Sequence, residues 1–190
     1  MNNRNVIAID IAKNILQGCV ITKHGELKSN KAYTPNKLKE LLINSVPSVV
    51  VMEGCGSCHH WGRFAQAHGH TVRIINPRKV KAYRQGHKTD ANDALAIAAA
   101  YQHIGIKFCP VKTEEQQIMQ TLETSRQLLS KHLTAMGNHL RAYVYEYGIV
   151  MRKGRKTLGE AMMRILDEEE NRLPECLKAG LRTLWEQYQQ

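Results

Sequence analysis

Short apolar segments in the first half of the chain have the length and composition of β-strands. Residues 6–11, Leu16–Ile21 and Leu27–Tyr33 are rich in apolar or β-branched side chains, so they predict three successive strands. Gly25 suits the turn between the second and the third. Residues 49–52 form a continuous apolar run, which is typical of a strand buried on both faces of a sheet. The pattern therefore predicts a three-stranded meander beside a central parallel strand.

Apolar positions at three- and four-residue steps predict helices between and after these strands. A helix is expected to start at Thr34-Pro35, and others at about 61–68 and 91–103, with a further strand at Thr71–Ile75. Strands that alternate with helices favour an α/β fold, in which helices cover both faces of a mixed sheet.

A single long helix is predicted in the second half of the chain. Between Thr113 and about Tyr147 there is no proline, and apolar residues recur at steps of three and four. At roughly 1.5 Å per residue such a helix extends about 50 Å, which is too long for a small domain. It could fold onto its own domain, or form a coiled coil that dimerises or grips nucleic acid, and the pattern fits both equally.

Two further helices are predicted after the long one, at about 158–172 and from Pro174 onward. We therefore divide the chain into an α/β domain at 1–112 and a helical coiled-coil region at 113–190. The last residues run to Gln190 without a glycine, a proline or a tail-like composition, so we expect the chain to be truncated.

The chain is basic, with 27 lysines and arginines against 17 acids and a formal net charge of +10. This excess suits a polyanionic partner such as nucleic acid, although composition alone leaves a merely basic soluble protein equally open. No apolar run approaches the roughly 20 residues of a membrane span, and the N-terminus lacks a secretory signal. We expect a cytoplasmic protein without a membrane partner, whose five cysteines are free thiols.

Four acidic residues occupy positions that suggest a functional role for their carboxylates. Asp10 lies in an apolar strand, where an ionised carboxylate is costly unless it is paired, metal-bound or at the strand's edge. Glu53 directly follows the buried run 49–52, at the carboxyl end of a strand, where α/β sheets commonly place functional groups. Asp90 and Asp93 are three residues apart in a predicted helix, so both project from one face.

Four carboxylates arranged in this way suit a two-metal phosphoryl-transfer site. Their hard oxygen ligands fit Mg²⁺ or Mn²⁺, and two ions would stabilise the attacking and departing oxygens. The alternative for the helical pair is structural, with Asp90 as the helix N-cap and Asp93 as a favourable charge in the first turn. Taken alone the pair favours that alternative, but Asp10 and Glu53 in the same unit favour catalytic, metal-binding roles for all four.

Two basic clusters are candidates for contact with nucleic acid. The first has no acidic residue and directly precedes the helical acids, which suits a loop that grips a phosphate backbone beside the metals rather than a plain solvated face. For the second, nucleic-acid contact and solvation fit equally. The clusters are Arg78, Lys79, Lys81, Arg84 and Lys88, and then Arg152, Lys153, Arg155 and Lys156.

Cys55, Cys58 and His59 have the C-x-x-C-H spacing of covalent haem attachment. Haem attachment requires an exported chain, and a zinc site of the usual kind requires a second cysteine pair that the sequence lacks. We expect these residues to pack the start of the helix after Glu53, or to line the rim of the active site.

Four motifs occur in an order that resembles a known family of enzymes. They are Ala-Ile-Asp-Ile-Ala-Lys at 8–13, Val-Met-Glu-Gly-Cys-Gly at 51–56, Ile-Asn-Pro-Arg at 75–78 and Lys-Thr-Asp-Ala-Asn-Asp-Ala at 88–94. Together they resemble the DEDD transposases of the insertion sequence 110 family, including the related pilin-gene invertases. The stretch 55–63 is most similar to the insertion sequence 1111 branch, and similar segments extend the resemblance over nearly the whole chain.

The resemblance implies a RuvC-like, ribonuclease-H-type α/β domain in which Asp10, Glu53, Asp90 and Asp93 take the four metal-binding positions. It implies DNA as a partner in a bacterial, nucleoid-associated setting and, in some members, a guide RNA encoded by the element. The long helix resembles a dimerising coiled coil of the family, so a homo-oligomer is expected. Family members also carry a C-terminal domain with a serine thought to attack DNA, and no match to it occurs before Gln190.

We therefore expect a transposase or DNA recombinase of an insertion sequence, here as its N-terminal part, that cleaves and transfers strands with the help of metal ions. A free-standing structure-specific nuclease and a non-catalytic nucleic-acid-binding or dimerisation remnant are the alternatives. Metal-dependent cleavage by this chain alone would favour the nuclease, and binding without cleavage after loss of all four acids would favour the remnant.

Overall fold

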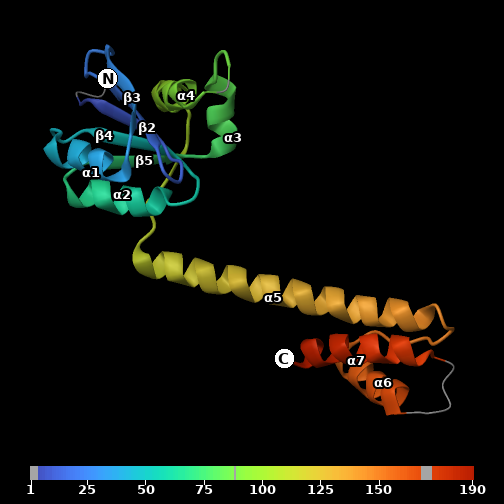
Figure 1. The fold of residues 1–190 in the computed structure, drawn as a ribbon. Helices are drawn as coiled ribbons and strands as arrows, with labels where there is room; N and C mark the ends of the chain where they lie inside the picture. Colours follow the sequence, from blue (N-terminus) through green and yellow to red (C-terminus); the bar gives the residue numbers. More distant parts are fainter. Residues whose placement is uncertain (1–3, 88, 168–172) are drawn as a thin grey trace. The chain divides into compact units, whose positions relative to one another are not determined.

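The computed structural model describes residues 4–87, 89–167 and 173–190 (Figure 1). The chain divides into two compact units, Met1–Gln117 and Ile118–Gln190. The first unit contains all the strands of the described residues, and the second is helical. No helix in the described ranges is both long enough and apolar enough to cross a lipid bilayer.

A six-stranded mixed sheet forms the centre of the first unit. Its strands are β1 (Val6–Asp10), β2 (Leu16–Ile21), β3 (Leu27–Tyr33), β4 (Val49–Glu53), β5 (Thr71–Ile75) and β6 (Phe108–Cys109), in the spatial order β3-β2-β1-β4-β5-β6. The first three strands form an antiparallel meander, β4 and β5 run parallel to β1, and β6 returns antiparallel. The predicted meander and the predicted buried parallel strand are confirmed, whereas two exposed residues carry too little pattern to predict β6.

Pairing on both sides fixes the register of β1. Ile9 lies opposite Gly18 of β2 and opposite Met52 of β4. The first four residues of β1 and of β4 are all buried. A shift of one residue would move every side chain of β1 to the other face, so burial holds the register firmly. The last residues of β1 and β4 consequently lie side by side at one end of the sheet.

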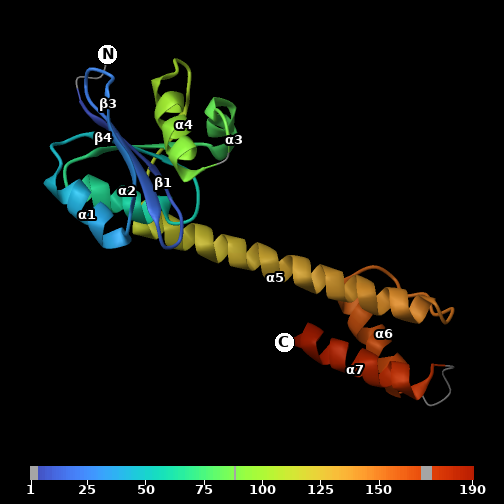
Figure 2. The same cartoon turned by 45° about the horizontal axis from the view of Figure 1, so that its top comes forward.

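Helices cover both faces of the sheet (Figure 2). They are α1 (Pro35–Asn44), α2 (Cys58–Ala67), α3 (Pro77–Val80), the 3-10 helix η1 (Lys81–Tyr83) and α4 (Asp90–Gln102). Leu38 of α1 and Trp61 of α2 belong to an apolar core on one face. Ile97 and the buried alanines of α4 belong to the core on the other face, where small side chains let the helix approach the strands closely. The predicted α/β class, with helices on both faces of a mixed sheet, is confirmed.

The long helix α5 (Glu114–Tyr145) confirms the prediction of one uninterrupted helix. After it, α6 (Arg155–Asp167) and α7 (Glu175–Gln189) contribute to the apolar core of the second unit. The last helix follows Pro174, as predicted. The other predicted helix starts slightly earlier than expected, and its predicted end at 168–172 lies outside the described residues.

The two parts of α5 differ in burial. Leu140 and Val144 are fully buried in the core that α5 shares with α6 and α7. Ile118, Leu122 and Leu129 are 57%, 61% and 62% exposed. The C-terminal turns therefore fold onto their own unit, and for the earlier turns the coiled coil stays a prediction.

Candidate active site

Asp10 and Glu53 are the last residues of two adjacent parallel strands. Asp10 ends β1 and Glu53 ends β4, and the residues before them, Ile9 and Met52, are partners in the parallel ladder. Both acids are partly buried, directly after strand residues that are fully buried. The fold therefore brings two of the predicted acids together at the carboxyl end of the sheet's centre.

Asp90 and Asp93 lie in the first turn of α4, whose cap is Thr89. The Thr89 hydroxyl accepts a hydrogen bond from the backbone N–H of Asn92 at 3.3 Å, and its carbonyl accepts one from that of Asp93 at 2.9 Å. Asp90 is therefore not the N-cap, which corrects that part of the structural alternative. Asp90 is exposed, whereas the Asp93 side chain is only 14% exposed and is the more enclosed of the two.

The four carboxylates are close enough to act on one another electrostatically. Burial, followed by the negative charges of Asp93, Asp90 and Glu53, raises the pKa of Asp10 from 3.8 to about 6. Burial also raises the pKa of Glu53; the charge of Arg84 opposes that rise, and the charge of Asp93 adds to it. The predicted acids thus share one electrostatic environment in which their ionised forms repel one another.

A guanidinium lies among these acids. Arg84 follows η1, and its Nε contacts Oδ1 of Asp93 in an ion pair whose side chains are 28% and 14% exposed, respectively. Its positive charge also lowers the pKa of Asp10, against the larger effect of burial. We predicted Arg84 as a contact to nucleic acid, and in this structure its partner is a carboxylate of the candidate site.

The donor set suits a hard divalent cation. The acids offer only carboxylate oxygens, which Mg²⁺ and Mn²⁺ prefer to softer ligands. Burial is the main cause of the raised pKa of Asp10, and the repulsion that adds to it is of the kind that a bound cation relieves. Across the described part of the chain, no three His, Cys, Asp or Glu side chains lie close enough together to hold one ion. The acids therefore suit such an ion in charge and donor chemistry but not in their present spacing, and the role of Asp10, Glu53, Asp90 and Asp93 as metal ligands stays a prediction.

Hydrogen bonds connect the strands of the meander with the helix that carries Asp93. Gln17, the ladder partner of Asp10 on β2, donates from Nε2 to Oδ1 of Asn30 at 2.8 Å. Asn30, on β3, donates from Nδ2 to the carbonyl of Ala91 in α4 at 3.0 Å. These two amides hold the first turn of α4 to the sheet. Sequence reasoning missed both, because nothing in a strand's pattern reveals the partner of an amide.

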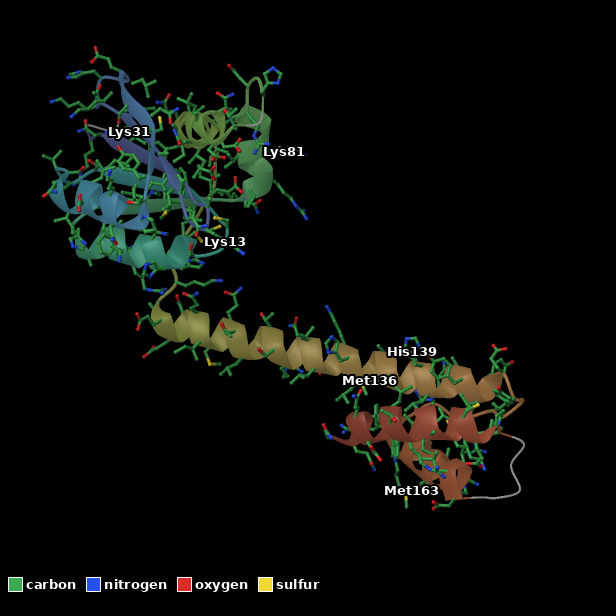
Figure 3. The ribbon with its side chains drawn as sticks, in the orientation of Figure 1. Lys13, Lys31, Lys81, Met136, His139 and Met163 are labelled. Carbon is green, nitrogen blue, oxygen red and sulfur yellow. The ribbon has the colours of Figure 1, made fainter. Side chains whose placement is uncertain are left out.

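The described bases of the first cluster lie near this end of the sheet. Arg78 and Lys79 are exposed on α3, which directly follows β5, and Lys81 is exposed on η1. Figure 3 places another base, Lys13, on the loop that follows β1. Lys88 lies outside the described residues. A surface of positive charge therefore accompanies the carboxylates.

Of the two cysteines near Glu53, Cys58 has a packing role. Cys58 is the first residue of α2 and is buried in the apolar core, as expected for a residue that packs the start of this helix. Burial, with smaller contributions from Cys58, Glu53 and Asp10, raises the pKa of the Cys55 thiol to about 11. Cys55 therefore lies near the carboxylates and stays protonated at neutral pH. All five cysteines are free thiols, as predicted.

Helix α2 also holds the segment that leads into α5. Nδ1 of His59 accepts a hydrogen bond from the backbone N–H of Lys112 at 3.1 Å. Arg63 donates from Nη1 to the carbonyl of Lys112 at 3.0 Å and to Oε1 of Gln117 at 2.9 Å. His59 is thereby engaged in a structural contact that its place in the C-x-x-C-H spacing did not suggest.

The second basic cluster belongs to the other unit and is exposed between the end of α5 and the first turn of α6. The guanidinium of Arg155 lies over the ring of Tyr188, 5.8 Å from its centre. Arg141 of α5 donates to the carbonyl of Gly154 at 2.8 Å, so another base lies beside this segment. The members are Arg152, Lys153, Arg155 and Lys156.

A sequence model of the DEDD transposases of insertion sequence 110, described as transposases, matches residues 7–149. The chain belongs to this transposase family. The match runs from β1 past the end of α5 and includes the positions of all four acids. The resemblance that the motifs indicated is confirmed.

Relatives in this family come from several bacteria. A "Probable family 20 transposase" of Pseudomonas aeruginosa is 32% identical over 188 residues, which cover 98% of this chain and 56% of that protein. The transposase for insertion sequence element IS1111A of Coxiella burnetii is 35% identical, over 97% and 51% of the two chains. A solved structure of RuvC from T. thermophilus in complex with a Holliday junction substrate has a TM-score of 0.38 and 17% identity, covering 56% of this chain and 99% of that chain. The chain spans about half the length of the curated relatives it matches.

Proposed function

We propose that this chain is the metal-dependent nuclease part of an insertion-sequence transposase, a DNA recombinase that cleaves and transfers strands. The observation that carries the proposal is that Asp10 and Glu53 end adjacent parallel strands, where burial and the charges of the acids of α4 raise the pKa of Asp10 to about 6. Membership of the transposase family supports it. The proposed catalytic residues are Asp10, Glu53, Asp90 and Asp93.

These carboxylates would hold Mg²⁺ or Mn²⁺, and we propose two ions. When bound, divalent ions supply charge stabilisation to the attacking and departing oxygens of a phosphodiester. The protein's own contribution is positional, because the doubly paired strand β1 and the parallel strand β4 fix Asp10 and Glu53 before any cation arrives. Since Asp10 holds its proton up to about pH 6, cation binding is coupled to loss of that proton.

The exposed bases would bind the nucleic-acid backbone. Arg78, Lys79 and Lys81 project from α3 and η1, the elements that follow β5, and we propose that they contact DNA phosphates near the carboxylates. Arg84 and Lys88 belong to the same proposed set. The second cluster, Arg152 to Lys156, would contact DNA or a guide RNA encoded by the element. A formal net charge of +10 is consistent with such a partner in the bacterial cytoplasm.

We propose that residues 1–112 act as the catalytic domain and 113–190 as a helical region for assembly. The exposed apolar side chains of Ile118, Leu122 and Leu129 recur at helical spacing on α5 and suit a coiled coil with a second copy. The chain spans about half the length of its curated relatives, so complete strand exchange is proposed only for a whole transposase of that length.

Metal titration tests the site directly. Mg²⁺ and Mn²⁺ are titrated into the wild type, Asp10→Asn, Asp93→Asn and the control Glu40→Gln, an exposed acid on α1, while heat of binding and thermal midpoint are recorded. We expect the wild type and the control to bind alike, and both site variants to fold but lose at least about tenfold in affinity. Site variants that bind as well as the wild type would refute the four-carboxylate assignment and leave the binding remnant as the better explanation.

Cleavage of linear and branched duplex DNA by the chain alone separates the remaining possibilities. Metal-dependent cutting that disappears in Asp10→Asn would favour a free-standing structure-specific nuclease. Metal and DNA binding without cutting is the result expected for part of a larger transposase.

A further inference from the structure

Arg84 differs from the other bases of its segment. Arg78, Lys79 and Lys81 are exposed, whereas Arg84 is partly buried and forms an ion pair with Asp93. Among the described residues 78–87, it is the only one in an ion pair. A basic side chain that contacts only solvent or DNA does not need a carboxylate partner, so the position of Arg84 requires its own explanation.

The local fold holds Arg84 in this place. Its backbone N–H donates to the carbonyl of Lys81 at 3.4 Å, which closes η1. Tyr83, the residue before it, packs against the apolar core under α4. The backbone that carries the guanidinium is therefore tied to the same helix that carries Asp93, and the ion pair is formed between neighbouring, anchored segments.

The positive charge of the Arg84 guanidinium acts on three of the acids. Arg84 contacts Asp93, and its charge also acts on Asp10 and Glu53, whose burial and mutual repulsion otherwise disfavour their ionised forms. The described structure thus has a single positive charge inside a group of negative ones. A divalent cation bound at the same place would stabilise the ionised carboxylates in the same way.

A metal ion and Arg84 would compete for Asp93. Mg²⁺ and Mn²⁺ bind carboxylate oxygens directly, so Oδ1 of Asp93 cannot keep its contact with Nε and also serve as a metal ligand without cost. Two cations beside the same oxygens also repel each other. A displaced guanidinium is suited to a new partner, because its planar donors match phosphate oxygens in a bidentate fashion.

We propose that Arg84 is the built-in counter-cation of this site, which neutralises Asp93 in the metal-free chain and is displaced by a divalent cation to bind a DNA phosphate. The inference rests on the proposed function, because it requires the carboxylates to bind such a cation. Metal binding and DNA binding are then linked through one side chain, and the linkage is reciprocal.

Calorimetric titration of Mg²⁺ into the wild type, Arg84→Gln and Lys81→Gln tests the competition. Lys81→Gln is the matched control, since it removes the same charge from an exposed position three residues away. We expect Arg84→Gln to bind Mg²⁺ about tenfold more tightly than the wild type, because Mg²⁺ no longer has to break the ion pair between Arg84 and Asp93. That pair is partly buried, so its strength lies between those of an exposed and a buried ion pair. The Mg²⁺ affinity of the control Lys81→Gln should stay within about twofold of that of the wild type. In EDTA, the thermal midpoint of Arg84→Gln should fall below that of the wild type.

DNA binding supplies the second readout. Fluorescence anisotropy with a duplex is measured in EDTA and in Ca²⁺, a cation that also binds carboxylate oxygens. We expect Arg84→Gln to weaken binding severalfold in Ca²⁺ and to leave binding in EDTA unchanged. Lys81→Gln should weaken it equally under both conditions. A purely structural role for Arg84 would not produce this dependence on the cation.

The outcomes separate this proposal from the one on which it rests. If Asp10→Asn abolishes Mg²⁺ binding but Arg84→Gln binds Mg²⁺ no more tightly than the wild type, the metal site stands and the counter-cation is refuted. If Asp10→Asn binds like the wild type, the proposed function fails and the counter-cation fails with it. Should Arg84→Gln not fold, Arg84→Lys replaces it, with an affinity expected above that of the wild type; equal affinity would again refute the proposal.

Discussion

Replacing Asp10 by asparagine tests the electrostatics of the site in the absence of metal. Burial, and then the charges of Asp93, Asp90 and Glu53, raise the pKa of Asp10 from its ordinary value of 3.8 to about 6. The folded chain therefore holds this proton more tightly than the unfolded chain. The stabilisation that the proton gives is complete below about pH 4 and is lost as the pH rises through about 6. Above that pH, the ionised carboxylate destabilises the metal-free fold.

The size of the effect follows from the two pKa values. At roughly 1.4 kcal/mol per pKa unit, the rise from 3.8 to about 6 corresponds to about 3 kcal/mol before screening. Because Asp10 is only partly buried, water screens part of this, and we expect about 1–2 kcal/mol. For a unit of this size, that is a gain of about 4–8 °C in the thermal midpoint of Asp10→Asn at pH 8.

The assay is thermal unfolding in EDTA between pH 4 and pH 8 for the wild type, Asp10→Asn and the control Glu40→Gln. The gain of Asp10→Asn over the wild type should be near zero at pH 4 and should grow through pH 6. The control should show no such growth. An Asp10→Asn variant that is less stable than the wild type at pH 8, or equally stabilised at both ends of the range, would show that burial and repulsion do not raise the pKa of Asp10.

Two further predictions concern packing and support. A Cβ on Gly62 would lie 2.8 Å from Cγ2 of Val111, so Gly62→Ala should destabilise the fold by about 1–3 kcal/mol in chemical denaturation. Gly180→Ala, in a helix and with nothing within 4 Å of the added Cβ, should instead stabilise the fold by about 0.5–1 kcal/mol. A Gly62→Ala variant as stable as the wild type would contradict the close packing of Gly62 against Val111. Asn30→Ala should lower Mg²⁺ affinity about tenfold because it releases the first turn of α4. The exposed Asn36→Ala should not, and equal affinities in calorimetry would rule out a positioning role for Asn30.

The sequence predicted the site best where one segment contains both a run of apolar residues and an acidic residue. The apolar runs before Asp10 and Glu53 predict buried strands, and an acid at the end of a buried strand points to the carboxyl end of the sheet. The long helix was predictable for the same reason, because its periodicity is local. Thr89 was also within reach, since threonine is a preferred cap and directly precedes the acidic first turn.

Contacts between distant segments were not predictable in this way. The amide of Asn30 meets the carbonyl of Ala91 across 61 positions of sequence, and neither residue has a spacing that indicates the other. Arg84 belongs to a run of bases, so its charge suggested phosphate, and only the fold of η1 against α4 places it at Asp93. Such pairs are decided by packing, which a one-dimensional pattern does not contain.

The edge strand β3 has a consequence for how copies of the chain meet. An unpaired strand edge can recruit a strand from another molecule and begin aggregation, and lysines on the edge oppose this. β3 is outermost in the sheet, and Lys28 and Lys31 are exposed on it, the latter with Nζ 5.5 Å from the ring centre of Tyr33 (Figure 3). The opposite edge strand, β6, is only two residues long. Growth of the sheet from chain to chain is therefore disfavoured at both edges.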